Sequence, residues 1–285
     1  MEKAFYEQVG HDSYLSTPAT VGPWSARAQH GGPPSALAAR AIELHEPDPR
    51  QRLARVCVDI LRPIPIGKLS LRTRTVRPGR RVALIETVVE ADGDEVLHAR
   101  GWRIERSAST IPRVGDGRPP EPVLAASEGL PPEIFAGQRQ GYLSMIEWRF
   151  TAPDFDGPAS PDPQLAGPAA TPGPDGLQAQ FRAAWTRPRI PLLAGEESSP
   201  MTRALLVADS GSGVGSALPA SGFTFINVDL TVVLQRDPVD DWLMLEASTV
   251  IGADGTGLAV TRLADPLGSF GHGMQTLLVA PLRSG

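Results

Sequence analysis

Two polar side chains lie where the surrounding sequence is apolar. Asp209 follows the run PMTRALLVA, which predicts a helix over residues 200–209, and a carboxylate at a helix C-terminus opposes the helix dipole. Such a carboxylate can act as a general base or as a nucleophile. The alternative is a helix-end Asp whose side chain binds the Ser210–Gly211 turn. Gln275 precedes the apolar residues TLLV, and a buried amide must find hydrogen-bond partners. It could hold a water beside Asp209 or pair with the neighbouring backbone.

A third polar side chain, Asn227, lies in the predicted strand FINVDLTVVLQRDP. An amide can both donate and accept hydrogen bonds, so Asn227 could orient a water molecule. Asp229 is two residues further on and should face the same side of a strand. We therefore expect Asp229 to compete with Asn227 for this role.

Glycines stand at both places where backbone N–H groups could be left free. Gly31 and Gly32 open the predicted helix HGGPPSALAARAIE, and N–H groups at a helix start suit a carbonyl oxygen that gains negative charge. In the second half, the loop Gly211–Gly215 is the corresponding candidate. His30 could be a cap, a donor to a ligand or a solvated side chain.

Composition excludes several classes of protein. The chain has 285 residues, 41% of them hydrophobic and 21% charged, which is typical of a globular protein of one large or two ordinary domains. A net charge of −5 argues against a nucleic-acid partner or an anionic membrane surface, and no run reaches the roughly 20 apolar residues of a membrane span. The N-terminus lacks an apolar signal core, so we expect a cytoplasmic protein. Cys57 is the only cysteine, so no intrachain disulfide is possible.

Motifs for metal, nucleotide and serine chemistry are missing. The five His and one Cys are scattered, so we expect no metal site and no cofactor. The sequence has no G-x-S-x-G motif, which argues against a serine hydrolase. The run GSGVGS follows a helix instead of joining a strand to a helix, which argues against nucleotide binding.

The elements that must position these side chains occur twice. Residues 30–105 and 200–279 each contain a helix followed by antiparallel strands, with the first helix ending by Glu46. This pattern predicts an α+β fold in which a helix lies in the concave face of each sheet, and two such units could share one sheet. Trp102 falls roughly where Gln275 falls in the repeat. The first half therefore looks structural, and the second carries the polar side chains.

We divide the chain into an N-terminal repeat (1–106), a linker (107–140) and a C-terminal repeat (141–285). Within the last, residues 141–150 and 177–190 are predicted strands, and residues 154–176, rich in Pro and Gly, are a predicted surface loop.

The order of motifs resembles the double hotdog fold of the acyl-CoA thioesterase II family, also called the thioesterase-like superfamily. The resemblance rests on HGGPPSALAARAIE, ILRPIP, RVALIETVVEADGDEVLHARGWRI, LLVADSGSG, FINVDLTVVLQRDP and GHGMQTLLV. It covers nearly the whole chain except about 107–140 and 155–175. Each motif is weak by itself, but their order and spacing are specific.

The resemblance implies an acyl-CoA thioesterase that associates as a dimer or larger homo-oligomer. In that family an Asp at the end of the second helix, a hydroxyl residue on the next strand and a Gln on the last strand hold the attacking water. These positions match Asp209, Asn227 and Gln275, so Asn227 departs from the family's hydroxyl. We expect His30, Gly31, Gly32 and Gly211 on the substrate-binding side.

Two other functions fit the same fold. One is a non-catalytic protein that binds acyl-CoA or an acyl chain, motivated by the departure at Asn227. The other is a hydratase or dehydratase of acyl thioesters, which would pair a His with an acid in the loop at a helix start. His30 is present, but no acid stands beside it in sequence before Glu43, which ranks this function third.

Overall fold

The computed structural model describes residues 3–107, 111–112, 114–115, 122–123, 141–151, 181–218 and 222–282. The first half contains β1 (Tyr6–Gly10), β2 (Ser13–Ser16), the 3-10 helix η1 (Pro18–Thr20), α1 (Gly32–Leu44), β3 (Gln51–Ile60), β4 (Lys68–Arg77), β5 (Val82–Ala91) and β6 (Asp94–Glu105). The second half contains α3 (Tyr142–Met145), β7 (Ile146–Phe150), β8 (Arg182–Pro188), α4 (Pro200–Ala208), α5 (Gly211–Val214), β9 (Phe223–Asn227), β10 (Asp229–Leu234), β11 (Leu243–Ile251), β12 (Thr256–Asp265) and β13 (Gly268–Pro281).

All the strands join one antiparallel sheet, in the order β1-β2-β4-β5-β6-β3-β10-β13-β12-β11-β8-β7, with β9 also paired to β13. Read from either edge, the order is the same: a hairpin, three strands of a meander, and the strand that follows the helix. The two halves meet at β3 and β10, where Thr231 lies opposite Cys57. The predicted pair of helix-plus-sheet units sharing one sheet is therefore present, and each unit also includes a hairpin, β1–β2 or β7–β8.

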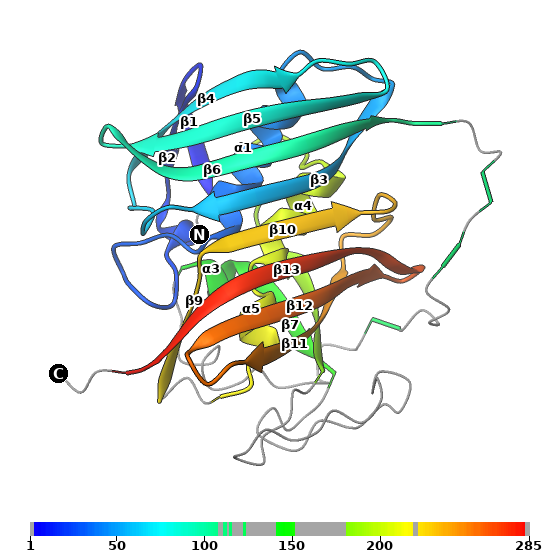
Figure 1. The fold of residues 1–285 in the computed structure, drawn as a ribbon. Coiled ribbons are helices and arrows are strands. Elements are labelled where there is room, and N and C mark those ends of the chain that lie inside the picture. The colour runs from blue at the N-terminus through cyan, green and yellow to red at the C-terminus, as the bar shows by residue number, and fades with distance from the viewer. Residues whose placement is uncertain are drawn as a thin grey trace.

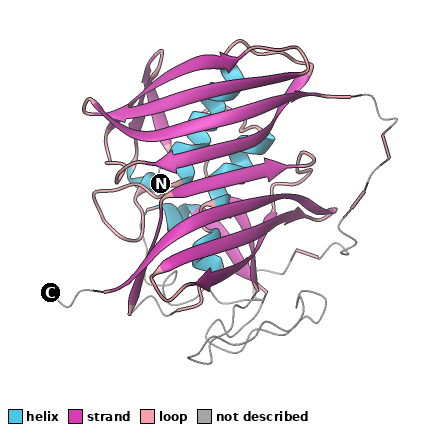
Figure 2. Ribbon diagram, in the orientation of Figure 1, coloured by secondary structure: helices cyan, strands magenta, loops and turns pink. Residues whose placement is uncertain are grey.

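The long helices lie together on one face of this sheet (Figures 1 and 2). α1 packs against α4, β5 and β6, and its side chains Leu37, Ala38 and Ile42 are fully buried. Pro33 and Pro34 start α1, where a missing N–H costs nothing, and the helix ends at Leu44, before Glu46, as predicted.

α1 and α4 run antiparallel and approach closely. A Cβ atom at Gly32, at the start of α1, would lie 2.3 Å from the carbonyl oxygen of Leu206, near the end of α4. Ser199, at the start of α4, donates to Glu43, near the end of α1 (2.6 Å). The helix pair therefore has two ends, which we call the Asp209 end and the Glu43 end.

Two predicted strands differ from the structure. Residues 142–145 form a helical turn, α3, and only Ile146–Phe150 are a strand, because Gly141 adopts a positive φ of 82° and turns the chain. The predicted strand over residues 225–238 is split at Val228 into β9 and β10. The N–H of Val228 donates to the carbonyl of Thr276 on β13, and the alternation of side chains is interrupted at Val228.

Trp102 is not the counterpart of Gln275. Its neighbour Gly101 faces α1, because a Cβ there would lie 2.8 Å from Ile42, so Trp102 faces the outer side of the sheet, below the guanidinium of Arg77. Gln275 faces the helices, so the two side chains lie on opposite faces. The residue of β6 that faces the end of a helix is Arg103, which donates to the carbonyls of His45 and Glu46.

Most of the predicted linker (107–140), the predicted loop (154–176) and the start of the predicted strand at 177–190 lie outside the described residues. The described elements of the two halves end at Glu105 and resume at Tyr142. The domain boundaries stay a prediction.

Candidate active site

The carboxylate of Asp209 lies at the centre of a polar cluster at the end of α4, and Asp209 is only 5% exposed. Its Oδ1 accepts hydrogen bonds from Asn227 Nδ2 (2.8 Å) and Gln275 Nε2 (3.3 Å). Its Oδ2 lies 3.0 Å from Nδ1 of His30. The fold thus brings four predicted site residues from separate elements into direct contact.

Gln275 joins the end of α4 to the start of α5. It is 1% exposed; its Nε2 also donates to the backbone carbonyl of Asp209 (3.0 Å), and its Oε1 accepts from the N–H of Ser212 (3.0 Å). Of the two alternatives expected from the sequence, pairing with backbone is present, and Gln275 also contacts the Asp209 carboxylate directly; the water stays a prediction. The amide fixes Asp209 in place.

Asn227 ends β9 and uses both of its amide hydrogens. They go to Asp209 and to the carbonyl of Asp229 (3.1 Å), and Oδ1 has no partner among the described residues. The carboxylate of Asp229 instead accepts from the N–H of Thr276 (2.5 Å). The expected competition from Asp229 is wrong, because the interruption at Val228 turns that side chain away from Asp209.

The start of α1 faces the same carboxylate. A Cβ atom at Gly31 would lie 2.8 Å from Oδ2 of Asp209, so a larger residue would displace it. Pro33 and Pro34 have no N–H, and the N–H of Ser35 bonds to the carbonyl of Gly31. The N–H of Gly32 donates to Nδ1 of His30 (3.1 Å), so His30 caps the start of α1. This leaves the N–H of Gly31, which has no partner in the described part of the chain.

His30 is held as a nearly enclosed ring, its side chain 10% exposed. It stacks on Tyr142, with ring centroids 3.7 Å apart and planes 11° apart. Burial lowers the pKa of His30, and the charge of Asp209 opposes this in part, so the ring is neutral at neutral pH. The hydroxyl of Tyr142 donates to the carbonyl of Leu206 (2.8 Å) and contacts Ser210 (2.9 Å), and burial raises its pKa far above the usual value.

Gly211 starts α5 and packs tightly under the site. A Cβ atom there would lie 2.1 Å from Oγ1 of Thr261 and 3.3 Å from Oε1 of Gln275. Sequence reasoning missed Thr261 and Tyr142. The first looks like any Thr of an alternating strand, and the second lies in the segment predicted as a strand, so neither carries a local signal.

The Glu43 end is built differently. Glu43 accepts from the hydroxyls of Ser199 and Thr202, and burial raises its pKa although these hydrogen bonds oppose the shift. Arg103, 4% exposed, covers the carbonyls at the end of α1.

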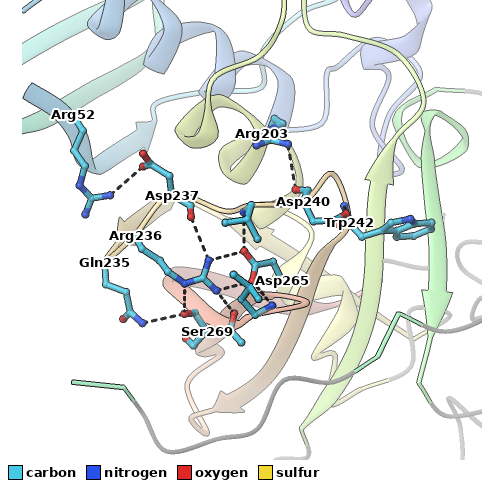
Figure 3. A network of polar contacts seen from close by, with 12 residues as sticks. Arg52, Arg203, Gln235, Arg236, Asp237, Asp240, Trp242, Asp265 and Ser269 are labelled. Atoms are coloured by element: carbon cyan, nitrogen blue, oxygen red, sulfur yellow. Dashed lines mark hydrogen bonds and ion pairs between the residues drawn. The ribbon is translucent and has the colours of Figure 1, made fainter. Parts of the chain in front are cut away.

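Beside the Glu43 end, ion pairs hold the loop after β10. Arg52 points to Asp237, and Arg236 forms a two-pronged pair with Asp265 (both 2.6 Å; Figure 3). Asp265 also accepts from the N–H groups of Val239 and Leu267. These oppositely charged side chains form ion pairs with one another and fix the loop to the sheet.

Within the described ranges, no three or more His, Cys, Asp or Glu side chains group together in a way that could hold a metal ion. None of the helices that the structure describes has the length and apolar character needed to cross a bilayer.

Two helix-on-sheet units that share one sheet make a double hotdog fold. A crystal structure of a protein with a hot dog fold from Alicyclobacillus acidocaldarius has this arrangement over 98% of this chain and 96% of its own, at 14% identity and a TM-score of 0.62. The predicted fold is confirmed.

Family models identify the chain more narrowly. The acyl-CoA thioesterase N-terminal domain matches residues 20–104 and the C-terminal domain matches residues 128–279, so the chain belongs to the acyl-CoA thioesterase family and is a thioester hydrolase. Similar solved structures include acyl-CoA thioesterase II TesB2 from Mycobacterium marinum (16% identity, 98% of this chain and 96% of that one, TM-score 0.63). Another is the tesB protein of Mycobacterium avium subs paratuberculosis (18%, 97% and 96%, TM-score 0.62). No curated protein matches the chain significantly.

Proposed function

We propose that the protein hydrolyses acyl-CoA thioesters to the free acid and coenzyme A, with the attacking water held by Asp209, Asn227 and Gln275. The observation that supports this most directly is the pair of contacts from Asn227 and Gln275 to one oxygen of the Asp209 carboxylate. They fix the carboxylate of Asp209, and Oδ1 of Asn227, which has no partner among the described residues, is left as an acceptor for a water molecule.

The substrate carbonyl would lie at the start of α1. Its oxygen gains negative charge when water adds, and the N–H group of Gly31 is a donor suited to that charge. The N–H of Gly32 could join it by exchanging its hydrogen bond to His30 for the substrate oxygen. His30 and Gly211 border the same space. In the overall reaction water adds to the carbonyl carbon, the C–S bond breaks, and coenzyme A leaves as a thiol.

The test is release of free thiol from a panel of acyl-CoAs of increasing chain length, comparing the wild type with Asp209→Asn. Activity on some chain length that collapses in the variant supports the proposal. Tight binding of acyl-CoA without release from any member would instead favour the non-catalytic binding protein that Asn227 suggests.

A hydratase gains one supporting observation. The sequence offers no acid beside His30, yet Asp209 lies 3.0 Å from it in the folded chain. This second candidate is tested by incubating the protein with a 2-enoyl-CoA and measuring whether the absorbance of the enoyl group falls as water adds. Gain of product without thiol release would favour it over hydrolysis.

Association and compartment stay predictions. We expect a dimer or larger homo-oligomer in the cytoplasm. Light scattering of the purified protein tests the first, and a single monomeric mass would contradict it.

A further inference from the structure

We infer that the loop at residues 22–28 binds the nucleotide end of coenzyme A, with the indole ring of Trp24 stacked on the adenine and the guanidinium of Arg27 paired with the phosphates. This inference rests on the proposed hydrolysis and deepens it, because it assigns a place to the part of the substrate that lies away from the thioester. Trp24 and Arg27 are then binding residues and take no part in the chemical step.

The loop at residues 22–28 leads directly into the Asp209 end of the helix pair. Its two sides are joined by an antiparallel bridge between Val21 and Gln29, and His30 is the next residue along the chain. A chain spans at most about 3.5 Å per residue, so the Cα atom of Arg27 lies within about 11 Å of that of His30. The loop is therefore close to the reacting groups without contacting them.

Backbone hydrogen bonds connect this loop to the rest of the border of the site. The N–H of Gln29 donates to the carbonyl of Ile64 (2.8 Å), and the N–H of Ile60 donates to the carbonyl of Val228 (2.8 Å). Val228 follows Asn227, which belongs to the polar cluster. The border thus consists of three connected segments, at residues 22–30, 60–66 and 227–229.

The charged end of an acyl-CoA must lie at such a border. The acyl chain is apolar and can be buried, whereas phosphate groups are costly to remove from water. The chain as a whole has a net charge of −5, which repels a polyanion. A cation beside the site is therefore needed to hold the phosphates.

Arg27 supplies that cation. It is exposed, and its guanidinium has neither a hydrogen bond nor an ion pair among the residues that the structure describes. Arg62, on the second segment of the border, is instead paired with Asp94 (2.8 Å). A guanidinium without an acidic partner can form two parallel hydrogen bonds to a phosphate.

Trp24 is the exposed aromatic side chain of the same loop, with 47% of its surface in contact with solvent. Nucleic-acid bases stack on such rings because every base has a π-face. The loop is held by its own hydrogen bonds: the N–H of Ala28 donates to the carbonyl of Ser25 (3.2 Å), and the N–H of Arg27 donates to the Ser25 hydroxyl (3.2 Å). A loop that is already ordered loses little conformational entropy when a ligand binds.

The other two segments of the border suit the arm that joins the nucleotide to the thioester. Each exposes about half of an apolar side chain, Leu61 on one and Val228 on the other. The pantetheine arm of coenzyme A is uncharged and partly apolar, so these side chains can pack against it. The whole border then matches the sequence of groups along the substrate.

The experiment compares two thioesters of one acyl group, acyl-CoA and acyl-pantetheine, which lacks the nucleotide. We expect Trp24→Ala to raise KM for acyl-CoA about tenfold, the worth of one stacked base. Arg27→Ala should raise it about fivefold, the worth of one charge-assisted contact to phosphate. In both variants kcat and the KM for acyl-pantetheine should stay unchanged, which also verifies that the variant is folded.

Two further variants are controls. Trp24→Phe keeps an aromatic face and should restore most of the affinity for acyl-CoA. Arg81→Ala removes an 82% exposed cation from the turn between β4 and β5 and should change neither KM. An unchanged KM for acyl-CoA in both loop variants, or an equal rise for acyl-pantetheine, would overturn the inference and leave hydrolysis itself standing.

Calorimetry separates this inference from the proposed function. It measures the Kd of a non-hydrolysable acyl-CoA thioether and of the matching acyl-pantetheine thioether. Wild type should bind the first more tightly, and Trp24→Ala should lose most of that difference. A wild type that releases no thiol would overturn the proposed function, whereas a difference in Kd that neither loop variant reduces would overturn the assignment of the loop.

Discussion

The two ends of the α1–α4 pair occupy equivalent places in the repeat, yet they differ in which backbone groups they leave open. At the Asp209 end, glycines and prolines start α1. The N–H of Gly31 has no partner among the described residues, that of Gly32 donates to His30, and Gly31 packs against the carboxylate of Asp209. At the Glu43 end, Ser199 caps α4 by accepting from the N–H of Thr202, and Arg103 covers the opposite carbonyls.

The difference shows how the same pair of packed helices can form a candidate active site at one end and purely structural contacts at the other. Capping uses the N–H donors at a helix start, whereas an N–H without a partner beside a carboxylate leaves both a donor and an acceptor for a ligand. Whether an end can do chemistry is thus decided by two or three residues at the helix termini.

The largest expected effect is the difference in kcat between variants of Asp209 and of Glu43, the carboxylates at the two ends of the helix pair. Asp209→Asn removes the carboxylate that we propose holds the water, and we expect kcat to fall about 10³-fold. The control, Glu43→Gln, keeps its hydrogen bonds to hydroxyl groups and should stay within a few-fold of wild type. Thiol release measures both, and an equal loss in the two variants would contradict the assignment of the site to one end.

The next prediction concerns the structural carboxylate Asp265, which is 0% exposed. Asp265→Asn breaks its pair with Arg236 and should lower the free energy of unfolding by about 3 kcal/mol, with unchanged kcat per folded molecule. Urea denaturation measures it. The exposed Asp12→Asn is the control and should have no effect.

The same carboxylate predicts a pH dependence of stability. Burial opposes ionisation, but Arg236 and the N–H groups of Val239 and Leu267 hold the pKa of Asp265 below its usual value. A lowered folded-state pKa contributes stability that is complete above the unfolded value, about 3.9, and is lost as pH falls through the folded pKa. The difference between wild type and Asp265→Asn should therefore shrink below about pH 4, and a constant difference would contradict this.

Gly31→Ala should affect chemistry more than stability. Its Cβ would lie 2.8 Å from Oδ2 of Asp209 and displace the carboxylate, and misplacement of a reacting group by about 1 Å can cost roughly 10²-fold in kcat. Gly273→Ala is the matched control, because its Cβ would make only ordinary contacts, at 3.7 Å or more. Equal kcat values for the two variants would argue against close packing at the Asp209 end.

The smallest effect tests the departure at Asn227. Asn227→Thr keeps one donor to Asp209 and should stay within about tenfold of wild type, the worth of one ordinary hydrogen bond. Asn227→Leu removes the contact and should cost about 10²-fold in kcat. If the Leu variant matched the Thr variant, Asn227 would have no role in holding the carboxylate or the water.

Much of this frame could be predicted from local sequence. Paired prolines and apolar spacing located α1, alternation located β4–β6, and the repeat indicated two units. Two errors occurred where a backbone irregularity interrupts a period. Gly141 turns the chain before β7, and the break at Val228 turns Asp229 away from the side that Asn227 faces.

The sequence by itself determined the repeat, the glycine and proline start of α1 and the carboxylate at the end of α4. Only the tertiary structure decided that these two termini meet, because the antiparallel packing of α1 on α4 places the start of one helix at the end of the other. It also paired His30 with Asp209 and stacked His30 on Tyr142. Such contacts depend on the packing of distant elements, and no pattern of neighbouring residues encodes them.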